Sequence, residues 1–287
     1  MSATDPAGDA ASRPVNGTIA SLQNPRVKAA VRLRDRPERD ATGLTIVDGG
    51  RELTRAIAAG VDIVEAFVCE ELIRTDDVLA AARELDAMSA RVWRVPVPVL
   101  EKVAFGERSE GIVALVRIPS LALADLAPPP DPLIAVVENI EKPGNLGAIL
   151  RSADGAGLDA LIAADPRTDL FNPNAIQASL GTIFSVPLAA ATTSETLSWL
   201  RRRGIRTVAA RVDGARVYTE ADLRGPLAIA LGSEAGGLSD AWRAADVEAV
   251  RLPMFGVGDS LNVSVAAAVL FYEARRQRGL PPGHNSA

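Results

Sequence analysis

Cysteine and histidine are almost absent from this sequence, which has one of each, Cys69 and His284. A single cysteine cannot form an internal disulfide, and one cysteine with one histidine cannot assemble a Cys/His zinc site. We therefore expect a cytoplasmic protein without a metal site. His284 lies in a Pro-Pro-Gly-His-Asn tail, where a solvated side chain is expected, so we do not expect histidine-based catalysis.

Long apolar runs are lacking as well. Runs such as residues 265–270 are far shorter than the roughly 20 residues that a membrane span requires, so we expect a soluble protein. Residues 1–17 lack the basic start and apolar stretch of a signal peptide and are rich in small and polar residues, which predicts a disordered leader. An apolar content of 48% over 287 residues can fill one large core or two ordinary ones, and we expect two domains.

A net positive charge is missing too. The formal charge of −5 argues mildly against a large nucleic-acid footprint, because binding to phosphates depends on Lys and Arg. Residues 25–40 are a local exception, with six basic and three acidic side chains at helical apolar spacing. On its own this pattern favours a solvated helix surface. If the segment does bind RNA, the candidate contacts are Arg26, Lys28, Arg32, Arg36 and Arg39.

Two α/β domains are predicted from the alternation of apolar patterns. In the first, residues 18–120, short β-type runs at 44–48, 63–68, 91–95 and 111–117 alternate with helical patterns at 51–59 and 76–86. Residues 121–132 contain four prolines and no periodicity, which predicts a linker. In the second domain, residues 133–287, strands are predicted at 133–137, 160–163, 186–190, 207–211 and 227–231, and helices at 146–154, 195–203 and 261–277. This order is typical of an open parallel sheet.

One glycine motif matches a dinucleotide-binding pattern but lies in the wrong structural context. Residues 155–160 match the dinucleotide-binding pattern G-x-G-x-x-A. That motif requires a strand before it and a helix after it, whereas here the pattern predicts a helix before and a strand after. Gly155 and Gly157 are therefore interpreted as helix-terminating residues, not as part of a nicotinamide site.

Three other glycine-bearing loops each follow a predicted strand and precede a helix, at residues 138–153, 230–239 and 251–268. Ligands of open α/β sheets bind at this edge. Taken singly, each loop has an ordinary explanation: Asn145 and Ser260 are good helix caps, and Glu234 is a suitable surface carboxylate.

Taken together and in this order, the loops resemble the three motifs of the SpoU/TrmH branch of the SPOUT RNA methyltransferases, over residues 133–277. The resemblance implies a trefoil-knotted SPOUT catalytic domain, with the second and third loops forming the knot, and a homodimer that packs through the knot. Residues 21–28 and 47–53 look like the smaller L30e/L7Ae-like α/β substrate-binding domain of many relatives. Asp48 stands where many relatives carry Glu, and Thr45 where an aromatic is common.

The resemblance also implies roles for single residues. The catalytic set would be Arg151, Asn145, Glu234, Ser260 and Asn262, with Glu234 and Asn262 orienting Arg151 and Asn145. S-adenosyl-L-methionine would bind mainly to backbone groups at Leu231, Gly232, Leu252, Met254 and Leu261. Because a guanidinium pKa lies above about 12, we interpret Arg151 as a phosphate clamp that stabilises the developing alkoxide and not as a base.

The sequence therefore predicts S-adenosylmethionine-dependent methylation of a ribose 2′-hydroxyl, and the added front domain favours 23S rRNA as the substrate. A chain rich in Ala and Arg, with three lysines, is typical of a GC-rich genome. Two-domain relatives that protect antibiotic producers look similar, which favours a uridine methyltransferase of the avilamycin-resistance type. The alternatives are a tRNA 2′-O-methyltransferase and a non-catalytic RNA-binding or assembly protein of the same fold.

Overall fold

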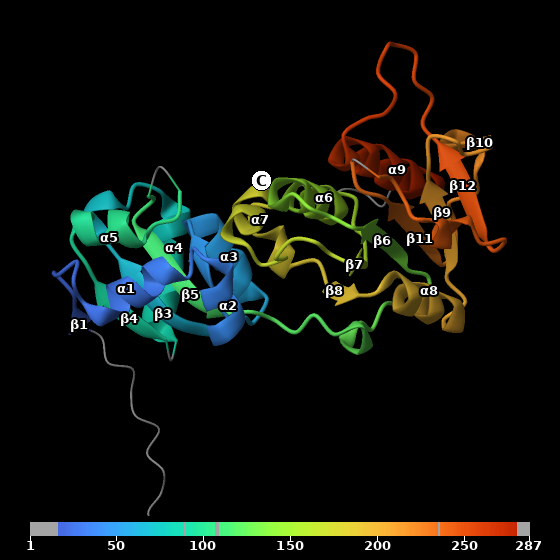
Figure 1. The fold of residues 1–287 in the computed structure, drawn as a ribbon. Helices are drawn as coiled ribbons and strands as arrows, with labels where there is room; N and C mark the ends of the chain where they lie inside the picture. Colours follow the sequence, from blue (N-terminus) through green and yellow to red (C-terminus); the bar gives the residue numbers. More distant parts are fainter. Residues whose placement is uncertain (1–16, 89, 107–108, 235, 280–287) are drawn as a thin grey trace, which may run out of the picture.

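The computed structural model describes residues 17–279 except 89, 107–108 and 235. It shows two α/β domains side by side, joined by an extended segment (Figure 1). The predicted leader, residues 1–17, lies outside the described residues except for Gly17, which is wrongly included because it begins a short strand. His284 also lies outside. No helix among the described residues is long and apolar enough to cross a membrane.

The first domain has a mixed sheet. Within the described residues its strands are β1 (Gly17–Thr18), β2 (Leu44–Asp48), β3 (Ile63–Val68), β4 (Arg91–Arg94) and β5 (Ile112–Arg117), in the order β1-β4-β3-β5-β2. Strand β5 runs antiparallel to both of its neighbours. The helices are α1 (Pro25–Arg32), α2 (Arg36–Thr42), α3 (Gly50–Ala58), α4 (Asp76–Ala87) and α5 (Val97–Val103).

This sheet buries both faces because successive side chains of a strand point to opposite sides. Phe67 belongs to the core shared with α1 and α5, whereas Val68 belongs to the core shared with α3 and α4. The predicted basic segment, residues 25–40, forms two helices and not one. Asn24 caps α1, accepting a hydrogen bond from the Arg26 backbone N–H, and a turn at Leu33–Asp35 separates it from α2.

The second domain confirms the predicted open parallel sheet. Its strands are β6 (Leu133–Glu138), β7 (Ala160–Ala164), β8 (Leu188–Ala191), β9 (Arg206–Ala210), β10 (Arg216–Val217), β11 (Leu227–Leu231) and β12 (Val247–Arg251). All neighbouring pairs are parallel in the order β10-β12-β9-β11-β6-β7-β8. The sequence patterns missed β10 and β12.

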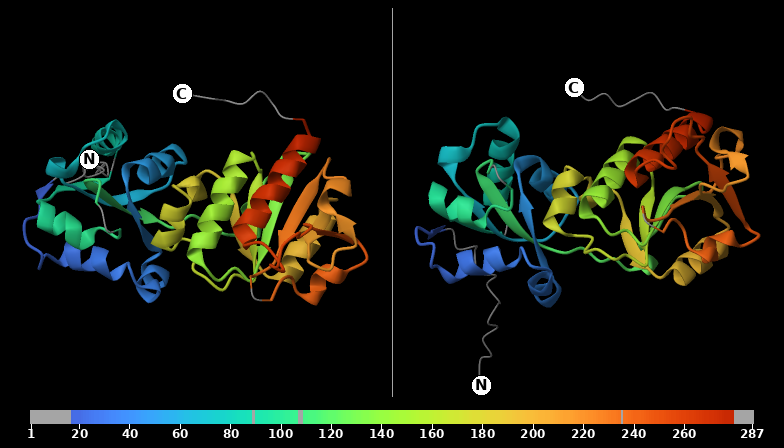
Figure 2. Two further views of the ribbon diagram at one scale, coloured as in Figure 1. Left: turned by 90° about the horizontal axis from the view of Figure 1, so that it is seen from above. Right: turned by 45° about the horizontal axis from the view of Figure 1, so that its top comes forward.

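Helices cover both faces of this sheet. They are α6 (Pro143–Gly155), α7 (Pro173–Ala178), α8 (Thr193–Arg202) and α9 (Val263–Gln277). Helices α6 and α9 lie side by side on one face, and α8 covers the other (Figure 2). The short helix α7 was not predicted. The prediction that residues 155–160 follow a helix and precede a strand is confirmed, because α6 ends at Gly155 and β7 begins at Ala160.

Two helix starts differ from the prediction, and both lie in the candidate site. Helix α6 begins at Pro143, so Asn145 lies in its first turn and is not its cap. Helix α9 begins at Val263 with Asn262 as its cap, a role that the sequence had offered to Ser260. Proline suits the first helical position because its missing N–H would have no helical partner there.

The predicted linker is held to the second domain. Ala122 forms a parallel bridge with Ala190, and Leu126 is buried in the core beneath α8. The interface between the domains also contains hydrogen bonds from side chains of α2, β2 and α3.

Candidate active site

A cavity of about 480 Å³ lies at the carboxyl edge of β9, β11 and β12. This volume is within the range of small-molecule sites. All five residues predicted to bind the cofactor line it: Leu231, Gly232, Leu252, Met254 and Leu261. Glu234 and Ser260 line it as well.

Gly232 is required by the shape of the loop that follows β11. A Cβ at this position would lie 2.0 Å from the backbone carbon of Gly237, closer than real Cβ atoms approach. The backbone of Gly237 donates to the carbonyl of Ser233 at 2.9 Å, with Gly237 at φ 63°. The loop therefore folds tightly back on itself beside the cavity.

Asn262 connects the three predicted loops. Its Nδ2 donates to Asn145 Oδ1 at 3.3 Å and to Glu234 Oε1. Its Oδ1 accepts from the backbone N–H of Ser264 at 2.9 Å, which caps α9. The structure thus brings together Asn145, Glu234 and Asn262, which are far apart in the sequence.

Glu234 is also paired with Lys142, a residue that the sequence analysis did not select. Lys142 Nζ donates to Glu234 Oε2. This contact, followed by a hydrogen bond from Asn145, holds the pKa of Glu234 below its ordinary value, and Glu234 in turn raises the pKa of Lys142. Lys142 is the only lysine of the second domain and lies in the first loop, a signal that could have identified it.

Arg151 stands apart from this group. It is exposed on α6, six residues beyond Asn145, which is well over one helical turn. No hydrogen bond or ion pair joins Arg151 to any of the described residues. Asn262 contacts Asn145 as expected, and Glu234 is bonded to Asn262 and Lys142, whereas the orientation of Arg151 by Glu234 and Asn262 stays a prediction.

A charged group that the sequence analysis missed lies on the other side of the cavity. Arg211 binds Asp213 through two hydrogen bonds of 2.9 and 2.8 Å, and Arg243 lies 3.1 Å from the same carboxylate. The hydrogen bond from Arg211 is the main cause that lowers the pKa of Asp213 to about 2. Arg211 follows β9 directly, and a charged residue at a parallel strand's carboxyl end is a usable signal.

The candidate RNA contacts of the first domain are only partly accessible. Lys28, Arg32 and Arg36 are exposed on α1 and α2. Arg26 lies 4.8 Å from the ring centroid of Trp93 and 2.5 Å from Glu65. Arg39 was wrongly predicted as an RNA contact, because its side chain is 1% exposed and is bonded to Asp169 of the second domain.

Comparison with known proteins agrees with this arrangement. Residues 132–272 match the SpoU rRNA Methylase family, and residues 24–114 match the MRM3-like substrate binding domain. The chain is 32% identical to a 23S rRNA (guanosine-2′-O-)-methyltransferase of Vibrio parahaemolyticus, over 75% of this chain and 89% of the relative. It is 30% identical to the 23S rRNA (uridine(2479)-2′-O)-methyltransferase of Streptomyces viridochromogenes, over 86% and 87% of the two chains.

A solved structure extends the comparison to the cofactor. The AdoMet-bound rRNA methyltransferase from Sinorhizobium meliloti matches with a TM-score of 0.82 and 27% identity, covering 91% of this chain and 98% of that chain. The family match, the sequence identity over most of the chain and the fold agree. The protein belongs to the SpoU rRNA methylase family.

Proposed function

We propose that this protein transfers a methyl group from S-adenosyl-L-methionine to a ribose 2′-hydroxyl in large-subunit ribosomal RNA. The observation that carries the proposal is the meeting of Asn145, Glu234 and Asn262, each from a different loop, beside one cavity. The named activities of the two relatives support the same reaction and the same class of RNA.

The cavity fits the cofactor. It combines apolar side chains, among them Leu231 and Leu252, with a glycine loop whose folded-back backbone leaves no room for a Cβ at Gly232. A site of this kind recognises a flat, polar-edged ring through backbone N–H and C=O groups and loop shape. When bound, the cofactor supplies an electrophilic methyl group on its sulfonium.

The protein's own residues would position the nucleophile. Asn262 and Lys142 engage the two oxygens of Glu234, which keeps this carboxylate ionised and fixed. The same network holds Asn145 where α6 begins. Arg151, exposed on α6, would bind the phosphate next to the reacting ribose and stabilise the alkoxide that forms as the proton leaves. Because an arginine guanidinium keeps its proton in proteins, Arg151 is not assigned the role of the base.

The exposed basic side chains of the first domain, Lys28, Arg32 and Arg36, would bind the RNA backbone, with Arg26 beside Trp93 at the edge of the same surface. We place this domain at residues 18–120 and the catalytic domain at residues 133–287. Four features remain predictions: the trefoil knot, the homodimer, uridine as the target nucleoside, and antibiotic resistance as the biological role of the methylation. A ribosomal RNA substrate implies action in the cytoplasm.

Methyl transfer to several RNAs tests the proposal. Labelled cofactor would be incubated with unmodified 23S rRNA, 16S rRNA and bulk tRNA, and 2′-O-methylation would be mapped by resistance to alkaline cleavage. We expect one 23S signal that Arg151→Ala abolishes. A tRNA signal would keep the reaction and overturn the substrate, whereas loss of both transfer and cofactor binding would favour the non-catalytic alternative.

A further inference from the structure

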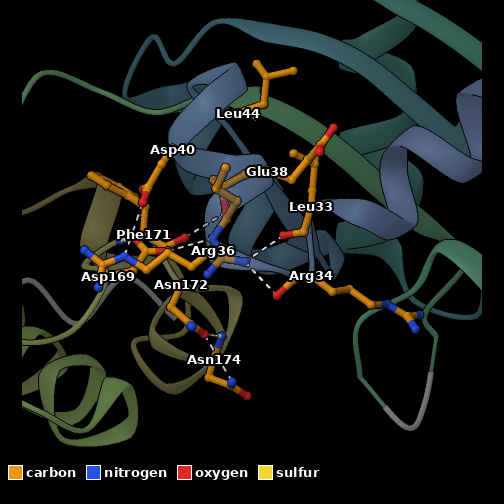
Figure 3. Close-up of polar contacts among 12 residues, drawn as sticks. Leu33, Arg34, Arg36, Glu38, Asp40, Leu44, Asp169, Phe171, Asn172 and Asn174 are labelled. Atoms are coloured by element: carbon orange, nitrogen blue, oxygen red, sulfur yellow. Dashed lines mark hydrogen bonds and ion pairs between the residues drawn. The ribbon is translucent and has the colours of Figure 1, made fainter.

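Arg39 lies at the junction of the two domains. Its Nε donates to Asp169 Oδ2 at 2.6 Å, and its Nη1 donates to the carbonyls of Leu33 and Arg34 at 2.7 and 2.8 Å. Figure 3 shows these partners, with Leu33 and Arg34 on one side of the contact and Asp169 on the other. One buried guanidinium thus connects the turn between α1 and α2 to the loop after β7.

The loop that contains Asp169 leads into α7. Asp169 Oδ1 accepts from the backbone N–H of Phe171 at 3.1 Å, and the Asp169 carbonyl accepts from the N–H of Asn172, the cap of α7. A second bond from the first domain reaches the same turn, because buried Thr45 donates through Oγ1 to the Phe171 carbonyl at 2.7 Å.

The other end of α7 is held by the first domain as well. Arg55 Nη1 donates to the carbonyl of Leu180 at 2.5 Å. A Cβ on Gly181, which has φ 81°, would lie 2.8 Å from Cα of Glu52, so the backbone of α3 approaches this turn closely. The first domain therefore contacts the residues on both sides of α7.

Helix α7 also packs against α6, the helix that carries Asn145 and Arg151. A Cβ on Gly147 of α6 would lie 2.6 Å from Cβ of Ala178 and 2.7 Å from the carbonyl oxygen of Ala175. Gly147 lies between Asn145 and Arg151 on α6. Figure 1 shows α7 between the first domain and α6.

We propose that Arg39 is a positioning residue that locks the substrate-binding domain onto α7, so that RNA held by that domain meets Asn145 and Arg151 at a fixed distance. This inference rests on the proposed function. The ion pair is 1% exposed at Arg39 and 12% at Asp169, and a buried charge without its partner is strongly unfavourable. Domain orientations that separate the two charges while either one stays buried are therefore strongly disfavoured.

The test compares Arg39→Met, Asp169→Asn and the double variant with a control, Arg117→Met. Arg117 belongs to the same domain, and its pair with Asp62 is exposed. We expect cofactor affinity within about twofold of the unchanged protein, because neither Arg39 nor Asp169 lines the cavity. Because small misplacement of reacting groups costs up to about 100-fold, we expect kcat/KM for 23S rRNA to fall 10- to 100-fold in each single variant.

Two further results separate positioning from RNA contact. Asp169→Asn removes a negative charge. If Arg39 acted only by attracting the RNA, this variant should bind RNA equally or more tightly and keep its kcat/KM. That result would overturn the proposal. Positioning predicts that the double variant is no worse than either single one. Arg39→Lys keeps the charge and should recover part of kcat/KM, which keeps the test valid if Arg39→Met does not fold.

Domain orientation can be measured without activity. Small-angle scattering of the full chain should show a broader distribution of shapes for Asp169→Asn than for Arg117→Met. Identical scattering for these two variants would overturn the proposal that the Arg39–Asp169 pair fixes the domain orientation. If the unchanged protein methylated no RNA, the proposed function would fail while this measurement still decided the role of Arg39.

Discussion

The carboxylate of Glu138 accepts two hydrogen bonds from Ser239, 101 residues further along the chain, one from its backbone N–H and one from Oγ, each 2.7 Å long. Glu138 is 1% exposed at the end of β6 and also accepts from Thr193 Oγ1 at 2.7 Å. It therefore fixes the far end of the loop that begins with Gly232 and lines the cofactor cavity.

Glu138→Gln should weaken cofactor binding. The amide replaces one acceptor oxygen by an N–H group, so at least one donor of Ser239 or Thr193 loses its partner, and hydrogen bonds to charged groups contribute roughly 1.5–3 kcal/mol. We expect the Kd for S-adenosylmethionine, measured by calorimetry, to rise by about tenfold or more. Glu220→Gln, at an exposed carboxylate, is the control. Equal affinities for the two variants would show that the loop does not depend on Glu138.

Gly232→Ala tests the tight loop itself. The added Cβ would collide with the backbone of Gly237, so the loop must open and the cavity change shape. We expect cofactor binding to be lost, as measured by calorimetry, while the circular dichroism of the protein stays close to that of the unchanged protein. Gly236→Ala is the matched change, because its Cβ would meet only Ser233 Oγ at 3.5 Å. It should lose far less affinity; a similar loss in both variants would count against a specific role for Gly232.

Asn262 has two functions that substitutions can separate. Asn262→Asp retains a capping oxygen for α9 but removes the donor to Asn145 and Glu234, whereas Asn262→Ala removes both. Loss of a cap costs about 0.5–2 kcal/mol, so thermal unfolding should show lower stability for the Ala variant. Turnover with RNA should fall at least tenfold in both. Normal turnover in the Asp variant would mean that the link between the loops is not needed.

The pairing of Lys142 with Glu234 predicts a pH dependence. Folding lowers the pKa of Glu234, so the pairing stabilises the folded state above the pKa of the unfolded chain, and this contribution disappears as the pH falls through the lowered pKa. Lys142→Met removes the largest cause of the lowered pKa of Glu234. The acid limb of kcat against pH should then move to higher pH, towards the ordinary glutamate value.

Arg167→Met is the control for this profile, because Arg167 pairs with neighbouring Glu141 and is exposed. An acid limb at the same pH in the Lys142 and Arg167 variants would show that ionised Glu234 does not limit turnover.

Much of the fold follows from local patterns. The strands β6 and β11 lie in the middle of a parallel sheet and are apolar on both faces, which gives a continuous apolar run that the sequence displays directly. The strand β12 was missed because Glu248 and Arg251 interrupt its apolar residues, and its partner β10 has two residues. Helix α7 is short and depends on packing against Gly147, a contact that no local pattern contains.

Site residues that belong to the loop motifs could be predicted from the sequence. Residues whose position depends on contacts between distant segments could not. Asn145, Glu234 and Asn262 meet because parallel strands place their loops at one edge. The burial of Arg39 could not be foreseen, because in α2 it follows the same helical spacing as its exposed neighbours. Its contacts with Asp169 of the second domain and with the carbonyls of Leu33 and Arg34 distinguish it from Arg36.

Arg151→Lys separates the proposed phosphate clamp from a simple positive charge. Lysine keeps the charge but cannot donate two parallel hydrogen bonds to a phosphate. Because Arg151 is bonded to none of the described residues, its replacement should leave cofactor affinity unchanged, as measured by calorimetry. We expect kcat with 23S rRNA to fall by about 10- to 1000-fold, since loss of a donor to a developing oxyanion has a cost of this order. If turnover and RNA affinity both stayed near normal, the forked geometry would have no role, and the alkoxide would have to be stabilised by the group around Asn145 instead.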